Sequence, residues 1–273
     1  MQLSLFQAAV LGVVQGLAEF LPISSSGHLI LVPWLLGWPD QSLTFDLALH
    51  LGTTAALLGY FWRDWLTLAR AFLAGLVSAA GREAPAWRLV WMLILGCLPA
   101  GVAGLLFENV IEQKLRQPWL VASMLIAFGI VLLVADRLAR RVRALDQIGF
   151  ADALIVGCAQ TLALVPGVSR SGITLTAGLL RGLDRPAAAR FSFLLSAPIT
   201  LAAAVYKLRV LFRAPPTGEE AIVFVVGVAT AAIVGALAIG FLLRYLQRSS
   251  TAIFVWYRVA AGVGILTLAL GTR

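Results

Sequence analysis

Long apolar runs without a charged residue restrict the fold of this sequence more than any other feature. Three such runs are 89–107, 118–135 and 221–243. Each has the roughly 18 to 20 residues that a helix needs to cross the hydrocarbon core of a membrane. Only 12% of the residues are charged, about half the roughly 25% that is usual in soluble domains. The sequence therefore predicts an all-α polytopic membrane protein and excludes one or two soluble domains.

Ten hydrophobic segments are present, and two of them, 26–37 and 172–182, are too short to cross comfortably. Each short segment follows one that ends in proline and serine. We therefore expect six spanning helices plus two re-entrant helix-loop-helix hairpins, all in a single membrane domain, residues 1–273. The mixed stretch 63–86 predicts an interfacial helix plus a loop. The segments are 2–20, 26–37, 43–62, 87–107, 118–135, 150–165, 172–182, 190–212, 221–243 and 252–271.

An internal repeat accounts for the two hairpins. The pattern of Gln, Leu-Ala, Pro and Ser-x-Ser-Gly begins at Gln15 and begins again at Gln160. Interrupted apolar helices at corresponding places in two halves are typical of inverted-topology repeats whose hairpins meet near the middle of the membrane. We expect residues 1–135 to form the first inverted repeat and residues 150–273 the second.

Arginine-rich loops predict the orientation. If both hairpins enter and leave on the same face, the loops 63–88, 137–143, 181–190 and 244–248 share one side, and the side richer in Lys and Arg faces the cytoplasm. These loops explain the net charge of +8, so no nucleic-acid partner is expected. The basic residues expected on the other side are Lys114, Arg116, Lys207, Arg209, Arg213 and Arg273.

Ionisable residues inside apolar segments are candidates for function, because a charge in a membrane is costly. They are Glu19, His28, Asp46, His50 and Arg170. For Asp46 and His50, a supporting pair and an interface cap are equally good interpretations, and the choice stays open.

Three further polar residues in apolar segments have simpler interpretations. Arg258 follows Trp256 and Tyr257 near an expected membrane surface, so we expect its charged end to snorkel into water. Cys97 and Cys158 have neither the density of a disulfide framework nor the spacing of a metal site. Both are expected to be small buried hydrophobes.

The first repeat places a carboxylate ahead of a serine-rich turn. Gln15 and Glu19 lie four residues apart on one helix face, and Pro22 then stops the helix. A helix that starts after such a break has free backbone amides, which attract anions. The residues after the break are Ser24, Ser25, Ser26, Gly27 and His28.

The second repeat offers a similar turn with a cation added. Arg170 lies between Ser169 and Ser171, and Thr174 follows. The planar guanidinium of arginine matches phosphate oxygens. Together the turns supply the charge stabilisation, the nucleophile and the proton acceptor or metal ligand that phosphate transfer needs. The structural alternatives are an ion pair between Glu19 and Arg170 and hydroxyls that merely join helices.

These motifs resemble those of the undecaprenyl-diphosphate phosphatases, the bacitracin-resistance family. One family motif is Glu or Gln, then Glu four residues later, then a Ser-rich turn that ends in Gly-His. The other is Pro-Gly-x-Ser-Arg-Ser-x-x-Thr, which here runs from Pro166 to Thr174. The resemblance covers essentially the whole chain. It implies hydrolysis of undecaprenyl diphosphate to the monophosphate, which recycles the lipid carrier for cell-wall synthesis, in the bacterial plasma (inner) membrane with the active site open to the outer face.

The resemblance and the chemistry together imply residue roles. Ser25 is expected to be the nucleophile and His28 its base, although His28 or water as the attacking group stays open. Arg170 would clamp the diphosphate. Glu19 would hold a divalent metal, Mg or Ca, or orient His28. Because the first motif position is Gln15 rather than Glu, metal binding would depend more heavily on Glu19. The expected substrate-binding residues are Gln15, Ser24, Ser26, Ser169, Ser171 and Thr174.

Two rival functions use related features. A lipid phosphatase of the acid-phosphatase type needs a histidine six residues after its Ser-Arg arginine, where this chain has Thr176, so that reading is rejected. A polyprenyl-phosphate transporter or flippase would use the same cavity between inverted repeats, but transport requires no nucleophile. A homodimer is left open.

Overall fold

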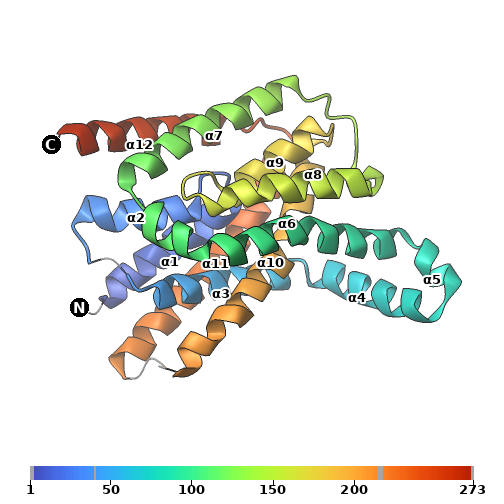
Figure 1. The fold of residues 1–273 in the computed structure, drawn as a ribbon, viewed down its shortest axis with the longest axis horizontal. Helices are drawn as coiled ribbons and strands as arrows, with labels where there is room; N and C mark the ends of the chain where they lie inside the picture. Colours follow the sequence, from blue (N-terminus) through green and yellow to red (C-terminus); the bar gives the residue numbers. More distant parts are fainter. Residues whose placement is uncertain (1–2, 40, 214–217, 272–273) are drawn as a thin grey trace.

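The computed structural model describes residues 3–39, 41–213 and 218–271. Within these ranges the chain is helical and forms no β-strand (Figure 1), which confirms the all-α prediction. The α-helices are α1 (Leu5–Phe20), α2 (Ser25–Leu36), α3 (Leu43–Tyr60), α4 (Trp62–Val77), α5 (Ala79–Glu83), α6 (Pro85–Lys114), α7 (Pro118–Leu138), α8 (Phe150–Thr161), α9 (Arg170–Leu180), α10 (Arg185–Arg213), α11 (Glu219–Leu246) and α12 (Ala252–Gly271), with 3-10 helices η1 (Leu145–Gln147) and η2 (Leu162–Leu164).

Five of the described helices, α6, α7, α10, α11 and α12, are long and apolar enough to cross a membrane. The expected span at α3 is not among them, because Asp46 and His50 interrupt its apolar sequence. Large apolar side chains such as Leu106 and Leu237 are exposed on the outside of these helices. An apolar surface of this kind requires lipid rather than water. Cys158 is also exposed, so the prediction that it is buried is wrong: it lies on the outside of α8.

The two predicted helix breaks are present and have the same local structure. α1 ends at Phe20 and α2 begins at Ser25. α8 ends at Thr161, η2 continues to Leu164, and α9 begins at Arg170. The residues that precede α2 and α9, Ser24 and Ser169, both have a positive φ, of 79° and 76°. Each caps its helix by accepting a hydrogen bond from the backbone N–H three residues later.

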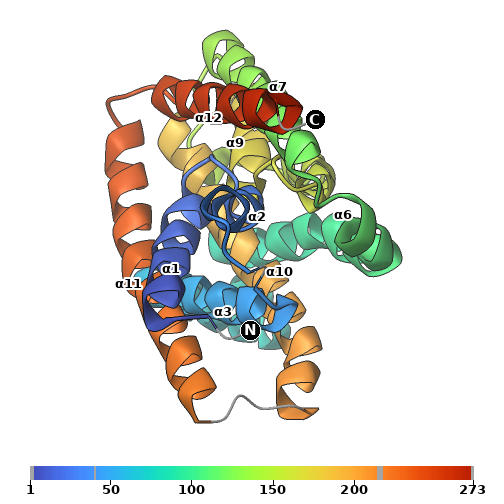
Figure 2. The same ribbon diagram turned by 90° about the vertical axis from the view of Figure 1, so that its left-hand side faces the viewer.

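Long helices enclose the two breaks. Figure 2 shows α1 alongside α11, and α12 lying along α7 at one end of the molecule. α3 also packs on α11, α6 packs on α8, and α10 packs on α9. The helices around the breaks therefore come from the whole length of the chain.

The arginine-rich loops contact one another. Arg190, at the start of α10, forms an ion pair with Asp64 in α4. Arg143 and Arg181 both bind Asp152, at 2.6 Å each. These pairs bring three of the four basic loops to one side of the molecule, where they were expected to lie together. Of the basic residues expected on the other side, Arg273 and the side chains of Lys114, Lys207, Arg209 and Arg213 lie outside the described residues.

The stretch 63–86 differs from its prediction. It forms two helices, α4 and α5, where one helix and a loop were expected. The second helix forms because the Ser78 side chain accepts a hydrogen bond from the backbone N–H of Gly81, and a cap of this kind stabilises a helix start by about 1 kcal/mol.

Candidate active site

A cavity of about 610 Å³ is bounded by both helix breaks. The predicted residues that line it are Glu19, Ser24, Ser25, Ser26, Ser169 and Arg170. The rest of its wall is mainly apolar, with Ala100, Leu105, Ile199 and Ala203 from α6 and α10. A cavity with a charged end and an apolar wall suits an amphiphilic ligand.

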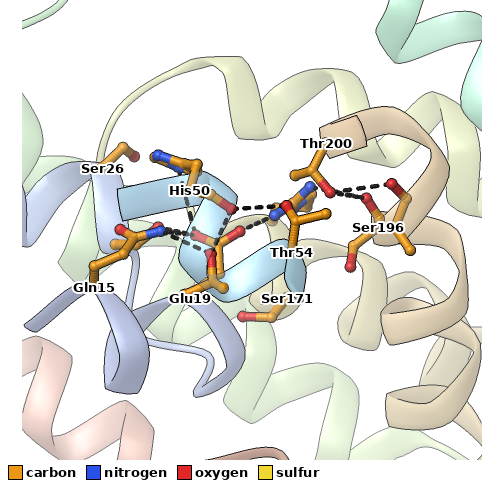
Figure 3. Close-up of polar contacts among 12 residues, drawn as sticks. Gln15, Glu19, Ser26, His50, Thr54, Ser171, Ser196 and Thr200 are labelled. Carbon is orange, nitrogen blue, oxygen red and sulfur yellow. Dashed lines mark hydrogen bonds and ion pairs between the residues drawn. The ribbon is translucent and has the colours of Figure 1, made fainter. Parts of the chain in front are cut away.

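Glu19 connects the two repeats. Its Oε2 accepts a hydrogen bond from Ser25 Oγ at 2.5 Å, and its Oε1 accepts one from Nη2 of Arg170. Gln15 Nε2 donates to Oε2 at 3.1 Å from one helical turn earlier (Figure 3). Ser25 and Arg170, which the sequence assigned to one site, therefore meet on the two oxygens of a single carboxylate.

The two turns are also joined directly. Ser24 Oγ accepts a hydrogen bond from the backbone N–H of Gly167 at 3.1 Å, and Ser171 Oγ donates to the carbonyl of Leu21 at 3.0 Å. A positive φ costs a residue other than glycine roughly 1 kcal/mol or more. The bonds between the turns offset that cost at Ser24, and they hold Ser25 and Arg170 in place as the first residues of α2 and α9.

Arg258 anchors both turns from α12. Its side chain is fully buried and donates to the carbonyls of Pro22, Gly167 and Val168, at 3.1, 2.9 and 3.0 Å. It also donates to two carbonyls of α7. The expectation that Arg258 snorkels into water is therefore wrong. Because α12 packs along α7, its side chain points into the protein, where carbonyl dipoles balance its charge.

His28 has partners other than those expected. Its Nδ1 lies 2.7 Å from the carbonyl oxygen of Ser24, which can only accept, so Nδ1 carries the proton. Its Nε2 then accepts from the hydroxyl of Tyr257 at 2.7 Å, and the two rings are stacked. Among the described residues the ring has no hydrogen bond to Ser25, and it does not line the cavity. The geometry therefore corrects the expected role of His28 as the base for Ser25: the acceptor next to Ser25 is Glu19.

His50, an ionisable candidate to which the sequence assigned no catalytic or binding role, is a site residue. It lines the cavity, and its Nε2 lies 3.7 Å from Oε2 of Glu19 (Figure 3). Its Nδ1 is 2.8 Å from the carbonyl of Asp46, which fixes the ring with Nε2 toward Glu19. The side chain of Asp46 interacts elsewhere, with Gln41 at 2.9 Å. The sequence signal for His50 was its position as an ionisable residue inside an apolar segment.

Three predicted substrate-binding residues lie behind the cavity wall. Gln15 is fully buried and reaches Glu19 rather than the cavity. Ser171 joins the two turns, and Thr174 Oγ1 lies 2.6 Å from Oγ of Ser192, between α9 and α10. None of the three lines the cavity, so the expectation of direct substrate binding gives way to a supporting position.

Comparison with known proteins identifies the family. The model of the family described as bacitracin resistance protein BacA matches residues 8–264. The chain belongs to this family. It is 49% identical over 271 residues to the undecaprenyl-diphosphatase of Thermomicrobium roseum, covering 97% of this chain and 98% of the relative. It is 51% identical over 257 residues to that of Moorella thermoacetica, covering 94% and 95%. Membership of the BacA family and the five long apolar helices make this chain a multi-pass membrane protein.

The described residues of this BacA-family site would supply only some of the ligands that a divalent metal needs. Gln15 Oε1 is buried without a hydrogen-bond partner among the described residues, and the Glu19 carboxylate is adjacent. Both are oxygen donors of the kind that Mg²⁺ and Ca²⁺ prefer. The described residues contain no group of three or more His, Cys, Asp and Glu side chains that could hold the ion by themselves. The remaining ligands would have to be diphosphate oxygens or water.

Proposed function

We propose that this protein hydrolyses undecaprenyl diphosphate to undecaprenyl phosphate and inorganic phosphate, which recycles the lipid carrier for cell-wall synthesis and gives resistance to bacitracin. The observation that carries the proposal is the meeting of Ser25 and Arg170 on Glu19 at the charged end of an apolar cavity. The activity named for relatives that are about half identical supports the choice of substrate.

Ser25 is the nucleophile in this mechanism. Its Oγ attacks the terminal phosphorus, the Oγ–P bond forms, and the P–O bond to the lipid phosphate breaks. The Oγ proton passes to Oε2 of Glu19, the acceptor 2.5 Å away, and then to the departing lipid phosphate. Water then attacks the phosphorus of the phosphoserine and gives a proton to Glu19, and the Oγ–P bond breaks. Glu19 returns that proton to Oγ, which restores Ser25 as inorganic phosphate is released. His50 faces the same carboxylate oxygen and stabilises its changing charge.

Arg170 binds the diphosphate oxygens whose charge grows as the bond breaks. Only one of its terminal nitrogens is bound to Glu19, and Nη1 makes a long contact of 3.4 Å to the carbonyl of Ser196. Its side chain lines the cavity, so a phosphate can replace the weaker contact. The free amides at the starts of α2 and α9, with Ser24, Ser26 and Ser169, complete the anion site.

A divalent metal, Mg²⁺ or Ca²⁺, forms part of the proposal. Glu19 and Oε1 of Gln15 would hold it, and when bound it neutralises charge on the diphosphate oxygens.

The membrane arrangement is likewise proposed. α3 is the sixth span, and α1–α2 and α8–α9 are re-entrant hairpins of two inverted repeats. The contact between basic loops supports placing that side in the cytoplasm of a bacterial inner membrane, with the active site open to the outer face. The lipid bilayer and the polyprenyl diphosphate are the partners, no nucleic acid is involved, and a homodimer stays open.

Phosphate release by purified protein in detergent tests the activity. Hydrolysis of undecaprenyl diphosphate that Ser25→Ala abolishes is expected. Transport of polyprenyl phosphate across proteoliposomes without phosphate release would favour the transporter instead. The 2.5 Å contact between Ser25 and Glu19 favours the enzyme, because transport needs no activated hydroxyl.

A further inference from the structure

Gln160 is a buried amide with no partner. It lies in α8, is 2% exposed and lines the cavity. Neither its Oε1 nor its Nε2 has a hydrogen-bond partner among the described residues. A buried polar group without a partner costs about 1–3 kcal/mol. Such a side chain facing a cavity is explained by a ligand that completes its hydrogen bonds.

The first repeat has a corresponding glutamine whose side-chain nitrogen is bound to the protein itself, unlike that of Gln160. Gln15 occupies the corresponding place in the first repeat, but its Nε2 is bound to Glu19 and Thr53, at 3.1 and 3.4 Å. The first glutamine therefore supports the carboxylate. Gln160 has no acidic neighbour of this kind and keeps both polar atoms free.

The position of Gln160 indicates which part of a ligand it meets. Ala163 and Leu164, which lie in the 3-10 helix η2 directly after α8, line the same cavity. Gln160 thus has apolar neighbours in the wall of a cavity that Glu19 and Arg170 also line, and we infer that it lies where the charged end adjoins the apolar wall. In an amphiphilic diphosphate the phosphate bonded to the hydrocarbon chain occupies that border, while the terminal phosphate lies deeper, near Ser25 and Arg170.

We propose that Gln160 binds the phosphate that carries the lipid chain, with Nε2 donating to a non-bridging oxygen and Oε1 accepting from a bound water. The proposal rests on the proposed function. Because this phosphate stays on the product, Gln160 holds substrate and lipid product alike. We infer that the hydrogen bond to a non-bridging oxygen has similar strength in the substrate and in the transition state, and such a contact changes binding while leaving the chemical step largely unaltered.

Gln160→Met tests the proposal, because methionine has a similar length and lacks the amide. We expect KM for undecaprenyl diphosphate to rise about tenfold, as for the loss of one hydrogen bond to a charged group, with kcat within about threefold. Farnesyl phosphate, a short lipid monophosphate, should bind about tenfold more weakly by calorimetry, with inorganic phosphate unaffected. The melting temperature should be unchanged or higher, because the variant removes two buried polar atoms that have no hydrogen-bond partner among the described residues. Cys158→Ala, an exposed change in the same helix, is the control and should alter none of these quantities.

Other outcomes overturn the proposal. An unchanged KM, weaker binding of inorganic phosphate alone, or a lower melting temperature in step with lost activity would each do so. If Gln160→Met fails to fold, Gln160→Glu keeps the shape and places a negative charge against phosphate. Parental farnesyl phosphate affinity in that variant overturns the contact. Calorimetry needs no turnover, so a parent protein that binds farnesyl phosphate without releasing phosphate would refute the hydrolase while still testing Gln160.

Discussion

Ser25 and Arg170 occupy the same position in the two halves of this protein. Each is the first residue of a helix, each follows a serine with positive φ, and each binds Glu19 through a different carboxylate oxygen. The repeat has thus diverged at one position into a hydroxyl on one side and a cation on the other. A phosphate between them would contact an attacking group and a charge-stabilising group at once.

Replacing Ser25 tests the nucleophile. Ser25→Ala should lower kcat by at least roughly a thousandfold, because only binding and electrostatic stabilisation remain. Phosphate release measures the loss, and the melting temperature should be unchanged, since a small hydroxyl contributes little to packing. Ser123→Ala, which removes a hydroxyl from α7 that bonds only to its own helix, is the control. Near-parental turnover of Ser25→Ala would transfer the attack to water.

Replacing Arg170 distinguishes a structural ion pair with Glu19 from a clamp on the phosphate. Lysine balances the charge of Glu19 but cannot place two donors on two oxygens. Arg170→Lys should therefore fold normally and lose at least roughly a hundredfold in kcat, about 2.7 kcal/mol of barrier. Arg181→Lys, at the Asp152 pair outside the cavity, should retain turnover. If kcat of Arg170→Lys falls by only a few-fold, Arg170 has a structural role rather than a catalytic one.

Glu19 and the metal are tested together. Glu19→Gln removes both the proton acceptor and the charged ligand, so turnover should fall to the level reached by the parent in excess chelator. Gln15→Glu replaces a donor to Glu19 with a second carboxylate, and its activity should depend more steeply on added Mg²⁺ or Ca²⁺. Titration of metal into chelated protein measures both effects. Full parental activity in excess chelator contradicts a metal requirement.

The two histidines should behave differently. His50 faces Glu19 in the cavity, so His50→Gln should lower kcat by roughly tenfold to a hundredfold, in the range of general acid–base effects. His28 links α2 to Tyr257 in α12, so His28→Gln should mainly lower the melting temperature. Tyr257→Phe, which removes the same bond from the other side, should produce the same shift. The opposite pattern would restore His28 as the base for Ser25.

Arg258 should behave as a stability residue. Arg258→Met leaves the carbonyls of Pro22, Gly167 and Val168 without this donor, and breaking buried charged contacts costs roughly 3–5 kcal/mol. We expect a large fall in melting temperature in detergent, with turnover lost in parallel. Arg248→Met, an exposed arginine just ahead of α12, is the matched control. A stable Arg258→Met with parental turnover would mean that the turns hold without it.

Much of the fold follows from features that the sequence states directly. Apolar length predicts the long helices, and the prolines predict the interruptions between α1 and α2 and between η2 and α9, because both depend on local composition and backbone chemistry. The meeting of Ser25 and Arg170 followed from the repeat. Local signals cannot reveal which way a side chain turns after packing. Arg258 looked like a surface arginine because only the packing of α12 along α7 directs it inward, and His28 looked like a base because Tyr257, far away in sequence, takes its free nitrogen.

The position of Arg258 in α12, which follows every residue that lines the cavity, has a consequence for biosynthesis. A ribosome that has delivered residues 1–250 to the membrane has supplied every side chain that lines the cavity. The two turns still lack the guanidinium that holds their carbonyls, because α12 follows. We expect nascent chains halted before α12 to be inactive and sensitive to protease at both turns. The insertion of α12 thus acts as the closing step in the assembly of the site, so the catalytic groups are aligned only after α12 has packed along α7.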